Sequence, residues 1–411
     1  MIIDINSTKL KSDKRLSNLF INSKFSNLSI NCNILKGNFF SDSFYYFPIT
    51  ENDETFSSLF TRDLNNTSHF YSQKFFDNFT DNKNSLKNFK FSDLLEVKNL
   101  DELNDKELLR CSENFLKESM FNLGISEFEH GSYLSFKRNS VIEEVINIKN
   151  YFFENGNNER VSSFNIFHIN EGSEISIIEE DIKENHSIFN LKLNKFICEN
   201  STIFKYGKSF NDHSQTYSLS YNYYQIKKDV VLSVDSIITS SFFNKEFIEV
   251  DLNNSGSDAK INILNLGKDE QHIDNNILIN HNAEHCTSFQ HVRNVLDNKS
   301  TAVFNGKVIV AEGAQQTDSN QSNKNLLLSL ESNAFSNPQL EIYADDVSCG
   351  HGSTTGALDE NSIFYLRARG IDYSSAQKIL IKAFAKEVID DFSLSSLQDI
   401  SEIALDSWIN G

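Results

Sequence analysis

The sequence predicts a mainly β chain built as a β-solenoid, with helical segments before and after it. Three observations favour this fold. Short strand-like runs fill residues 125–348, no helical pattern separates them, and their total length is too great for one ordinary sandwich. The missing crossover helices disfavour an alternating βαβ sheet. A sandwich and a barrel stay open as alternatives, because the residues alone show no strict repeat.

Residues 1–124 are the first expected region, which is mixed and mostly helical. Apolar residues recur at three- and four-residue steps between Leu100 and Leu123, which is the spacing of one helix face. The fragment Thr55–Phe60 shows a shorter version of this spacing. Polar, Asn-rich connectors separate these pieces, so the pattern names no particular fold for this region.

The β core is expected over residues 125–355. Its runs are rich in β-branched and aromatic residues, and Asn, Asp, Gly and Ser separate them. One polar run, Gln315–Asn325, suits Asn, Gln and Ser side chains that stack along a solenoid face. The runs expected to be strands are YLSFKR, SSFNIFHI, SEISIIEE, TYSLSYNYYQI, DVVLSVDSIITSS, FIEVDL, AKINILNL, NNILINH, AVFNGKVIV, NLLLSLES and QLEIYA.

Residues 356–411 are expected to form a helical domain. Asp359 is placed to cap a first helix over ENSIFYLRAR, and Gly370 is placed to end it. A second helix starts near Ser374 and carries an amphipathic stripe, and a third starts near Ser396.

Composition excludes several classes of protein. Apolar residues make up 39% of the 411 residues, which is ample for a core and excludes wholesale disorder. Asp plus Glu number 57 against 38 Lys plus Arg, and the resulting net charge of −19 repels phosphate backbones. Since the lysines form no basic patch, we expect no nucleic-acid partner.

The cysteines and the hydropathy pattern indicate a reducing, cytoplasmic setting. The five cysteines are widely spaced and include no CxxC, which argues against a disulfide framework and a zinc ribbon. The first residues, MIIDINSTKLKSDKRL, lack the apolar stretch of a signal peptide. No window approaches the roughly 20 apolar residues of a membrane span.

The stretch YADDVSCGHGSTTG, residues 343–356, concentrates the chemically active residues. A phosphate loop is disfavoured because the lysine of GxxxxGK[ST] is missing, and a Gly-Ser-Thr turn is the plainer interpretation of GHGSTTG. Cys349 and His351 would share one face of a strand, because side chains two residues apart point the same way. Two ligands do not complete a zinc site, so a site completed by another subunit is favoured. A thiolate with an imidazole also suits iron or an iron–sulfur species.

Other interpretations of these residues are weaker. Cysteine hydrolases usually draw their histidine from far along the chain, so the short spacing does not favour a nucleophilic Cys349. On a strand, Asp345 and Asp346 would point to opposite faces and form no acid–base dyad, which disfavours a carbohydrate-active solenoid enzyme. Turn carboxylates are the favoured interpretation of this pair.

A second group of histidine and cysteine residues lies before residue 292, and it could either bind a metal or have a structural role. His281, His285 and Cys286 lie close in sequence, with His291 beyond them. Hydrogen-bonded structural histidines are the favoured interpretation for this group. The three remaining cysteines, Cys32, Cys111 and Cys198, are expected to be small buried hydrophobic residues.

The segment from His281 to about Asp390 resembles the SufB/SufD family of iron–sulfur cluster assembly proteins. Within that family it is similar to the SufD branch, whose pattern is DDVxCxHGxTxGxLD followed by FYLxxRG. The SufB branch has a less glycine-rich sequence after the cysteine and carries further cysteines. Small-residue departures, in CGHGST and RARG, disturb the pattern little. The matching pieces are HNAEHCTSFQHVRNVLDNKSTAVFNGKVIV, AQQTDSNQSNKNLLLS, PQLEIYADDVSCGHGSTTGALDENSIFYLRARGI and KILIKAFAKEVI.

The resemblance implies a right-handed parallel β-helix core and a scaffold subunit that is not itself an enzyme. It implies pairing with SufB through the β-helix ends, with Cys349 and His351 at that interface as ligands of iron or a transient cluster. It also implies a role in iron acquisition and a reduced flavin in the complex, although no flavin motif is found. A homodimer in the absence of the partners stays open.

The resemblance further implies that the C-terminal helices bind SufC, the ABC-type ATPase. Two alternatives stay open: a SufB-type primary scaffold, and an interaction subunit without cluster ligands. The residues expected to contact SufC are Phe364, Leu366, Ile379, Leu380 and Phe384.

Overall fold

A computed structural model of the chain describes residues 2–3, 30–31, 71–73, 93–100, 103, 130–152, 159–183, 188–210, 216–239 and 241–411. The helices expected at Thr55–Phe60 and between Leu100 and Leu123 lie outside the described residues, apart from Leu100 and Leu103. Cys32 and Cys111 also lie outside them. The named elements in the described part of residues 1–124 are strands, and no α-helix lies among these described residues.

Two sheets of nine strands each form the body of the molecule, and each is parallel except for one antiparallel strand at its N-terminal end. From β5 onward, strands of even number belong to one sheet, here called the even sheet: β6 (Ile146–Phe152), β8 (Glu174–Lys183), β10 (Ile203–Phe210), β12 (Val231–Ile238), β14 (Asp258–Gly267), β16 (Thr287–Leu296), β18 (Thr317–Leu327) and β20 (Val347–Gly356). The odd sheet contains β5 (His130–Phe136), β7 (Glu159–Ile169), β9 (Ile188–Cys198), β11 (Tyr217–Ile226), β13 (Phe243–Leu252), β15 (His272–His281), β17 (Thr301–Val310) and β19 (Asn333–Ile342).

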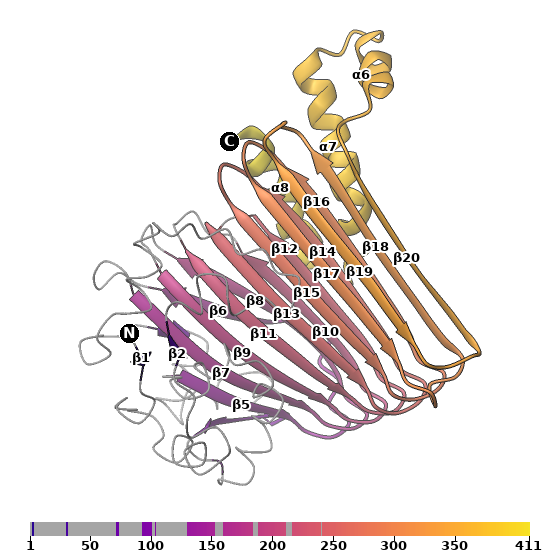
Figure 1. Cartoon of the computed structure of the whole chain (residues 1–411). Coiled ribbons are helices and arrows are strands. Elements are labelled where there is room, and N and C mark those ends of the chain that lie inside the picture. The colour runs from indigo at the N-terminus through magenta and orange to yellow at the C-terminus, as the bar shows by residue number, and fades with distance from the viewer. Residues whose placement is uncertain are drawn as a thin grey trace.

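The chain alternates between the two sheets, and each strand pairs in parallel with the strand two places later (Figure 1). Such winding is a parallel β-solenoid, so the predicted fold class is confirmed. Antiparallel strands close the N-terminal end: β3 (Tyr71–Gln73) pairs with β6, and β4 (Leu95–Asn99) pairs with β5. A separate small pair joins β1 (Ile2–Ile3) to β2 (Ile30–Asn31).

The interior repeats in register from turn to turn. Phe167, Phe196 and Tyr224 are partners on β7, β9 and β11, and their rings stack with centroids 4.8 and 4.4 Å apart. Each such aromatic pair adds about 0.5–1.5 kcal/mol beyond the burial of its area. The stacks belong to one apolar cluster between the sheets, which extends from Leu95 to Ala344.

Several strand predictions were wrong for one physical reason. The expected runs omit β6, β9, β10, β16 and β20, and they place a strand on NLLLSLES, although β18 ends at Leu327. The polar run Gln315–Asn325 is itself most of β18. These strands carry Asn, Gln, Ser and Lys on the inner face, so their sequences lack the simple alternation of apolar and polar residues.

Three helices follow the solenoid: α6 (Glu360–Arg367), α7 (Tyr373–Ile389) and α8 (Ser395–Asn410). The Asp359 carboxylate accepts a hydrogen bond from the Ser362 N–H at 3.0 Å, and Gly370 has a φ of +90°, so both predicted end signals are confirmed. Asp372 caps α7, which starts one residue before Ser374.

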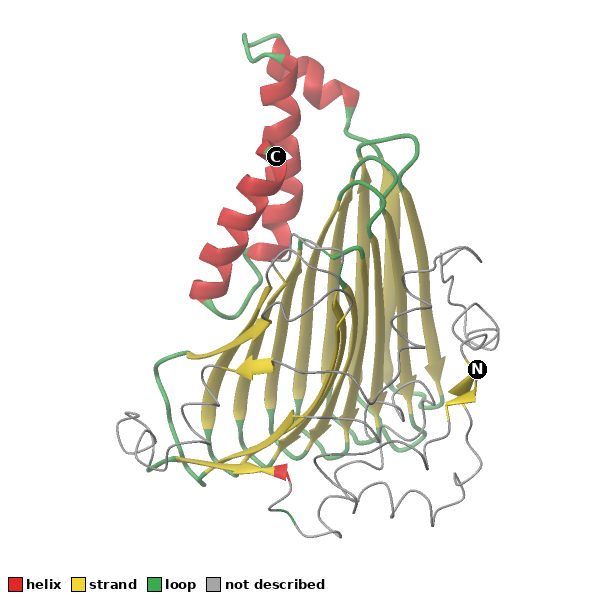
Figure 2. Ribbon diagram, turned by 90° about the vertical axis from the view of Figure 1, so that its left-hand side faces the viewer, coloured by secondary structure: helices red, strands yellow, loops and turns green. Residues whose placement is uncertain are grey.

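The last two helices cover the outer face of the even sheet (Figure 2). Ile237, Leu264 and Val295 of the sheet pack against Ile389 and Leu397 of the helices. Helix α6 lies beyond the strand ends (Figure 1). Within the described residues, no helix is long and apolar enough to cross a membrane.

Candidate functional site

Cys349 and His351 lie on β20, the last strand of the solenoid. The whole segment Val347–Gly356 pairs in parallel with β18, so the turn favoured for GHGSTTG is wrong. Cys349 faces Ser319 and His351 faces Gln321 across this pairing. Ser319 and Gln321 are buried inside the solenoid. Because paired residues of a sheet share a face, Cys349 and His351 both point inward.

The two side chains differ in exposure although they share a face. Cys349 is half-buried and packs against the apolar cluster between the sheets, whereas His351 is exposed. Burial raises the pKa of the Cys349 thiol above its ordinary value, while a backbone hydrogen bond from Ser319 acts in the opposite direction. The thiol is therefore protonated at neutral pH, which does not favour a free nucleophile.

The end of the solenoid is open at this strand. Strand β20 pairs with β18 on one side, and no described strand pairs with its other side. The neighbouring strand β19 ends the odd sheet in the same way. Large apolar side chains are exposed at this end: Phe335, Ile342 and Tyr343. Unpaired strand edges with exposed apolar residues are a surface that another sheet can cover.

Asp345 and Asp346 lie in a bend before β20, and both are exposed. The Asp346 N–H donates to Gln315 Oε1 at 2.9 Å, and the Gln316 N–H donates to the Asp346 carbonyl at 2.6 Å. These bonds use the backbone of Asp346, so they fix the bend and leave both carboxylates in solvent. The argument from strand alternation does not apply to this pair.

The second group of histidines and cysteine is dispersed. His281 is buried and its Nε2 lies 2.8 Å from Ser288 Oγ, whereas His285 is exposed on a turn with a φ of +57°. Cys286 is buried in the apolar cluster, as is Cys198. His291 lies on the outer face, 2.8 Å from Asp391. In the described part of the chain, no three His, Cys, Asp or Glu side chains are grouped to hold a metal.

The five helical residues expected to contact a partner do not form one surface. Phe364 is 74% exposed and Ile379 is 43% exposed. Leu366 and Leu380 are half-buried. Phe384 packs on the sheet side, with the Arg293 guanidinium 5.1 Å above its ring. The exposed members of this group therefore lie on α6 and on the first half of α7.

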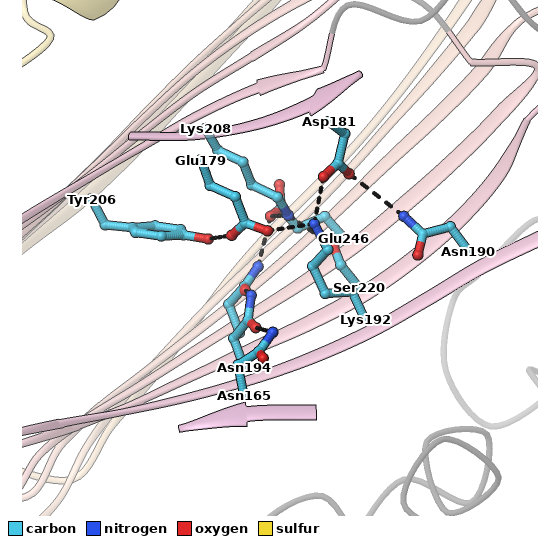
Figure 3. A network of polar contacts seen from close by, with 11 residues as sticks. Asn165, Glu179, Asp181, Asn190, Lys192, Asn194, Tyr206, Lys208, Ser220 and Glu246 are labelled. Carbon is cyan, nitrogen blue, oxygen red and sulfur yellow. Dashed lines mark hydrogen bonds and ion pairs between the residues drawn. The ribbon is translucent and has the colours of Figure 1, made fainter. Parts of the chain in front are cut away.

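Sequence reasoning missed a buried ionic network inside the solenoid (Figure 3). Lys192 Nζ donates to Glu179 Oε1 at 2.5 Å and to Asp181 Oδ1 at 2.7 Å. Lys208 Nζ donates to Glu246 Oε1 at 2.9 Å in the same network. Alternation along β8 could have found it, because Glu179 and Asp181 continue the inward positions of earlier isoleucines.

Polar side chains continue from this network toward the open end. Asn265 donates to Asn294 at 2.6 Å, Asn294 donates to Asn325 at 2.5 Å, and Asn325 donates to Thr355 Oγ1 of β20 at 2.9 Å. This row of hydrogen-bonded polar side chains ends at Thr355, four residues after His351 on β20. Cys349 packs instead against the apolar cluster.

Comparison with known proteins supplies the context of this site. Residues 152–384 match the family model described as "SUF system FeS cluster assembly, SufBD core domain". The chain is 33% identical over 230 residues to the iron–sulfur cluster assembly protein SufD of Escherichia coli (strain K12), covering 54% of this chain and 52% of that protein.

Two further relatives match over 122 and 268 residues. An iron–sulfur cluster assembly SufBD family protein of Synechocystis sp. is 42% identical over 122 residues, 30% of this chain and 26% of that protein. The chloroplastic protein ABCI7 of Arabidopsis thaliana is 26% identical over 268 residues, 63% of this chain and 56% of that protein. The chain thus spans about half the length, or less, of the curated relatives it matches.

Proposed function

Because this chain belongs to the SufB/SufD family of iron–sulfur cluster assembly proteins and is SufD-like, we propose that it is a non-enzymatic subunit of a SUF scaffold complex. In this complex it pairs with a SufB-like subunit and with the ATPase SufC in the cytoplasm. The nascent cluster, or the iron that enters it, is the cargo. A flavin in the complex has no support among the described residues.

One observation carries this proposal: Cys349 and His351 share the inner face of the open last strand. A thiolate and an imidazole are ligands for iron and iron–sulfur species. They supply half of a four-ligand set, so the cargo needs further ligands from a second subunit. His351 is exposed and can reach such a partner.

The open end supports SufB pairing at this place. A partner sheet that continued β19 and β20 would pair their free backbone groups. It would also cover Phe335, Ile342 and Tyr343. Both changes bury surface at the end of the solenoid that carries the candidate ligands. The same end would serve a homodimer when SufB is absent.

The C-terminal helices, residues 356–411, are the proposed SufC-binding part. Phe364 and Ile379 are exposed apolar side chains on α6 and α7, and α6 lies beyond the strands where a second subunit has room (Figure 1). Movement of these helices reaches the solenoid through the apolar cluster on the even sheet. ATP-dependent movement of SufC could thereby loosen the SufB interface and release the cargo, because a shared ligand set is lost when its interface opens.

The proposal is tested on the complex purified anaerobically after co-expression with SufB-like and SufC-like chains. His351→Ala and Cys349→Ser are expected to leave the complex assembled but to lower its iron and sulfide content after reconstitution. Ser353→Ala, on the same strand face, is the matched control. Unchanged iron and sulfide in both variants would leave only the alternative of an interaction subunit without cluster ligands.

SufC binding is tested by substitution and not by truncation. Removing residues 357–411 would expose Ile237, Leu264 and Val295 of the even sheet, so loss of binding could reflect a damaged core. Phe364→Asp and Ile379→Asp place charges on exposed sites, and they should abolish co-purification of SufC while SufB pairing persists. Ile403→Asp, an exposed site on α8, is the control. Retained SufC binding in both variants would refute this assignment.

A further inference from the structure

Three residues on successive turns form a column that ends at His351. Gln290 of β16 pairs in register with Gln321 of β18, and Gln321 pairs in register with His351 of β20. Gln290 is 0% exposed and Gln321 is 3% exposed, so this column lies on the inner face. Neighbouring strands are about 4.8 Å apart, so each side chain lies within reach of the next one.

The two glutamine amides are unpaired. Within the described residues, neither amide atom of Gln290 or of Gln321 has a hydrogen-bond partner. Other columns of the same sheet are bonded: Ser288 Oγ lies 2.8 Å from Ser319 Oγ, and Asn294 donates to Asn325. Buried polar groups are normally paired, so two adjacent unpaired amides behind an exposed histidine need an explanation.

The opposite sheet holds the Gln290 amide in place. A Cβ atom at Gly306 of β17 would lie 2.8 Å from Gln290 Oε1. The missing side chain of Gly306 therefore makes the room that this amide occupies. Gln290 is the buried end of the column. Along the column, the exposed polar side chain next to Gln321 is His351.

We propose that Gln321 is a positioning residue for His351 when the site is loaded. Gln321 Oε1 accepts the imidazole N–H that does not bind iron, and the Gln321 amide N–H donates to Gln290 Oε1. A neutral imidazole has one donor and one acceptor nitrogen, so holding the donor fixes which nitrogen faces the cargo. This inference rests on the proposed function, because it assumes that His351 is a ligand.

A neutral amide suits this position better than a carboxylate. Metal-binding histidines commonly donate their second N–H to an oxygen acceptor. A carboxylate at position 321 would be a buried negative charge, and burying a charge without a partner is costly. Glutamine supplies the acceptor oxygen without adding a charge.

The test measures Fe²⁺ affinity of the anaerobic SufB–SufC–SufD complex and the melting temperature of this chain. Gln321→Met keeps the length of the side chain and removes the amide, and we expect it to weaken Fe²⁺ binding about 10–100-fold. The melting temperature should not fall, because an unpaired buried amide is removed. Gln321→Glu, which retains an acceptor oxygen, should restore part of the affinity. Gln290→Met should have a smaller effect.

A double-mutant cycle separates this inference from the proposed function. In the His351→Ala background, Gln321→Met should cause no further loss of Fe²⁺ affinity, because its effect passes through His351. An equal loss in both backgrounds, or wild-type affinity in Gln321→Met, would overturn the inference. If His351→Ala itself binds Fe²⁺ normally, the proposed function fails instead. Should Gln321→Met not fold, Gln321→Asn, whose amide is too short to reach, gives the same comparison.

Discussion

Asp235 is expected to hold the C-terminal helices on the solenoid. It lies on the outer face of β12 and is fully buried. Its Oδ2 accepts hydrogen bonds from the Ser393 N–H at 2.7 Å and from the Ser393 hydroxyl at 2.6 Å, while Oδ1 accepts one from Asn262 at 2.8 Å. Ser393 belongs to the connection between α7 and α8, so one carboxylate ties this connection to the sheet.

Asp235→Asn should weaken this attachment although it changes the shape little. An amide presents one acceptor oxygen and one N–H₂ donor. Ser393 and Asn262 both donate to this side chain, so one of them would then point its N–H at another N–H. A hydrogen bond to a charged group contributes about 1.5–3 kcal/mol. Part of this loss is offset, because burial raises the pKa of Asp235 and the charge is costly to bury. We expect a net loss of about 2 kcal/mol, or roughly thirtyfold in the equilibrium for undocking.

Native-state hydrogen exchange measures this effect. Amides of α8, Ser395–Asn410, should exchange roughly thirtyfold faster in Asp235→Asn, while those of β14 and β16 change little. Asp318→Asn, an exposed carboxylate on the outer face of β18, is the control. Unchanged exchange in α8, or an equal increase throughout the solenoid, would refute a local role for Asp235.

Two further predictions concern stability. A Cβ at Gly207 of β10 would lie 3.1 Å from Leu397 and 3.3 Å from Leu394. Gly207→Val should therefore lower the free energy of unfolding by about 1–3 kcal/mol and speed proteolysis of α8, and Gly207→Ala should have a smaller effect. Equal proteolysis rates in the variants and the wild type would contradict this packing. Burial lowers the pKa of His272 and His281 to about 4, so the unfolded chain takes up protons first as the pH falls below about 6.5. The free energy of unfolding should therefore fall by about 2 kcal/mol per histidine between pH 7 and pH 5. Urea titrations of His281→Gln should show a smaller fall over this pH range than the wild type. A fall as large as that of the wild type would contradict the assignment to His281.

Local pattern was sufficient to predict the fold class and the C-terminal helices. Alternating runs such as SEISIIEE became β8, because period-two alternation directly reflects strand geometry. Asp359 and Gly370 marked the ends of α6, because capping depends on adjacent residues only. The polar strand β18 was misplaced, because its inward Asn and Gln residues are stabilised by neighbours about 30 residues away in sequence, such as Asn294 bonded to Asn325.

The candidate site divides in the same way. The spacing of Cys349 and His351 was enough to predict a shared strand face. The sequence pattern could not predict the column of Gln290 and Gln321 behind His351, because this column depends on the register between turns of the solenoid. The dispersal of His281, His285 and Cys286 had the same origin: a turn between β15 and β16 sends neighbours in sequence to different surfaces.

The position of Cys349 and His351 follows from the geometry of a solenoid. Every inner turn is covered by the next one, so an inward side chain is reachable only on a terminal turn. Ser319 and Gln321 occupy the equivalent positions one turn earlier, and both are buried. A thiol and an imidazole at those positions could hold an ion but could neither receive it from a partner nor release it. Placed on β20, the same pair is held by the solenoid on one side and open on the other. Under the proposed function, docking of a second subunit would complete this ligand set and undocking would dismantle it.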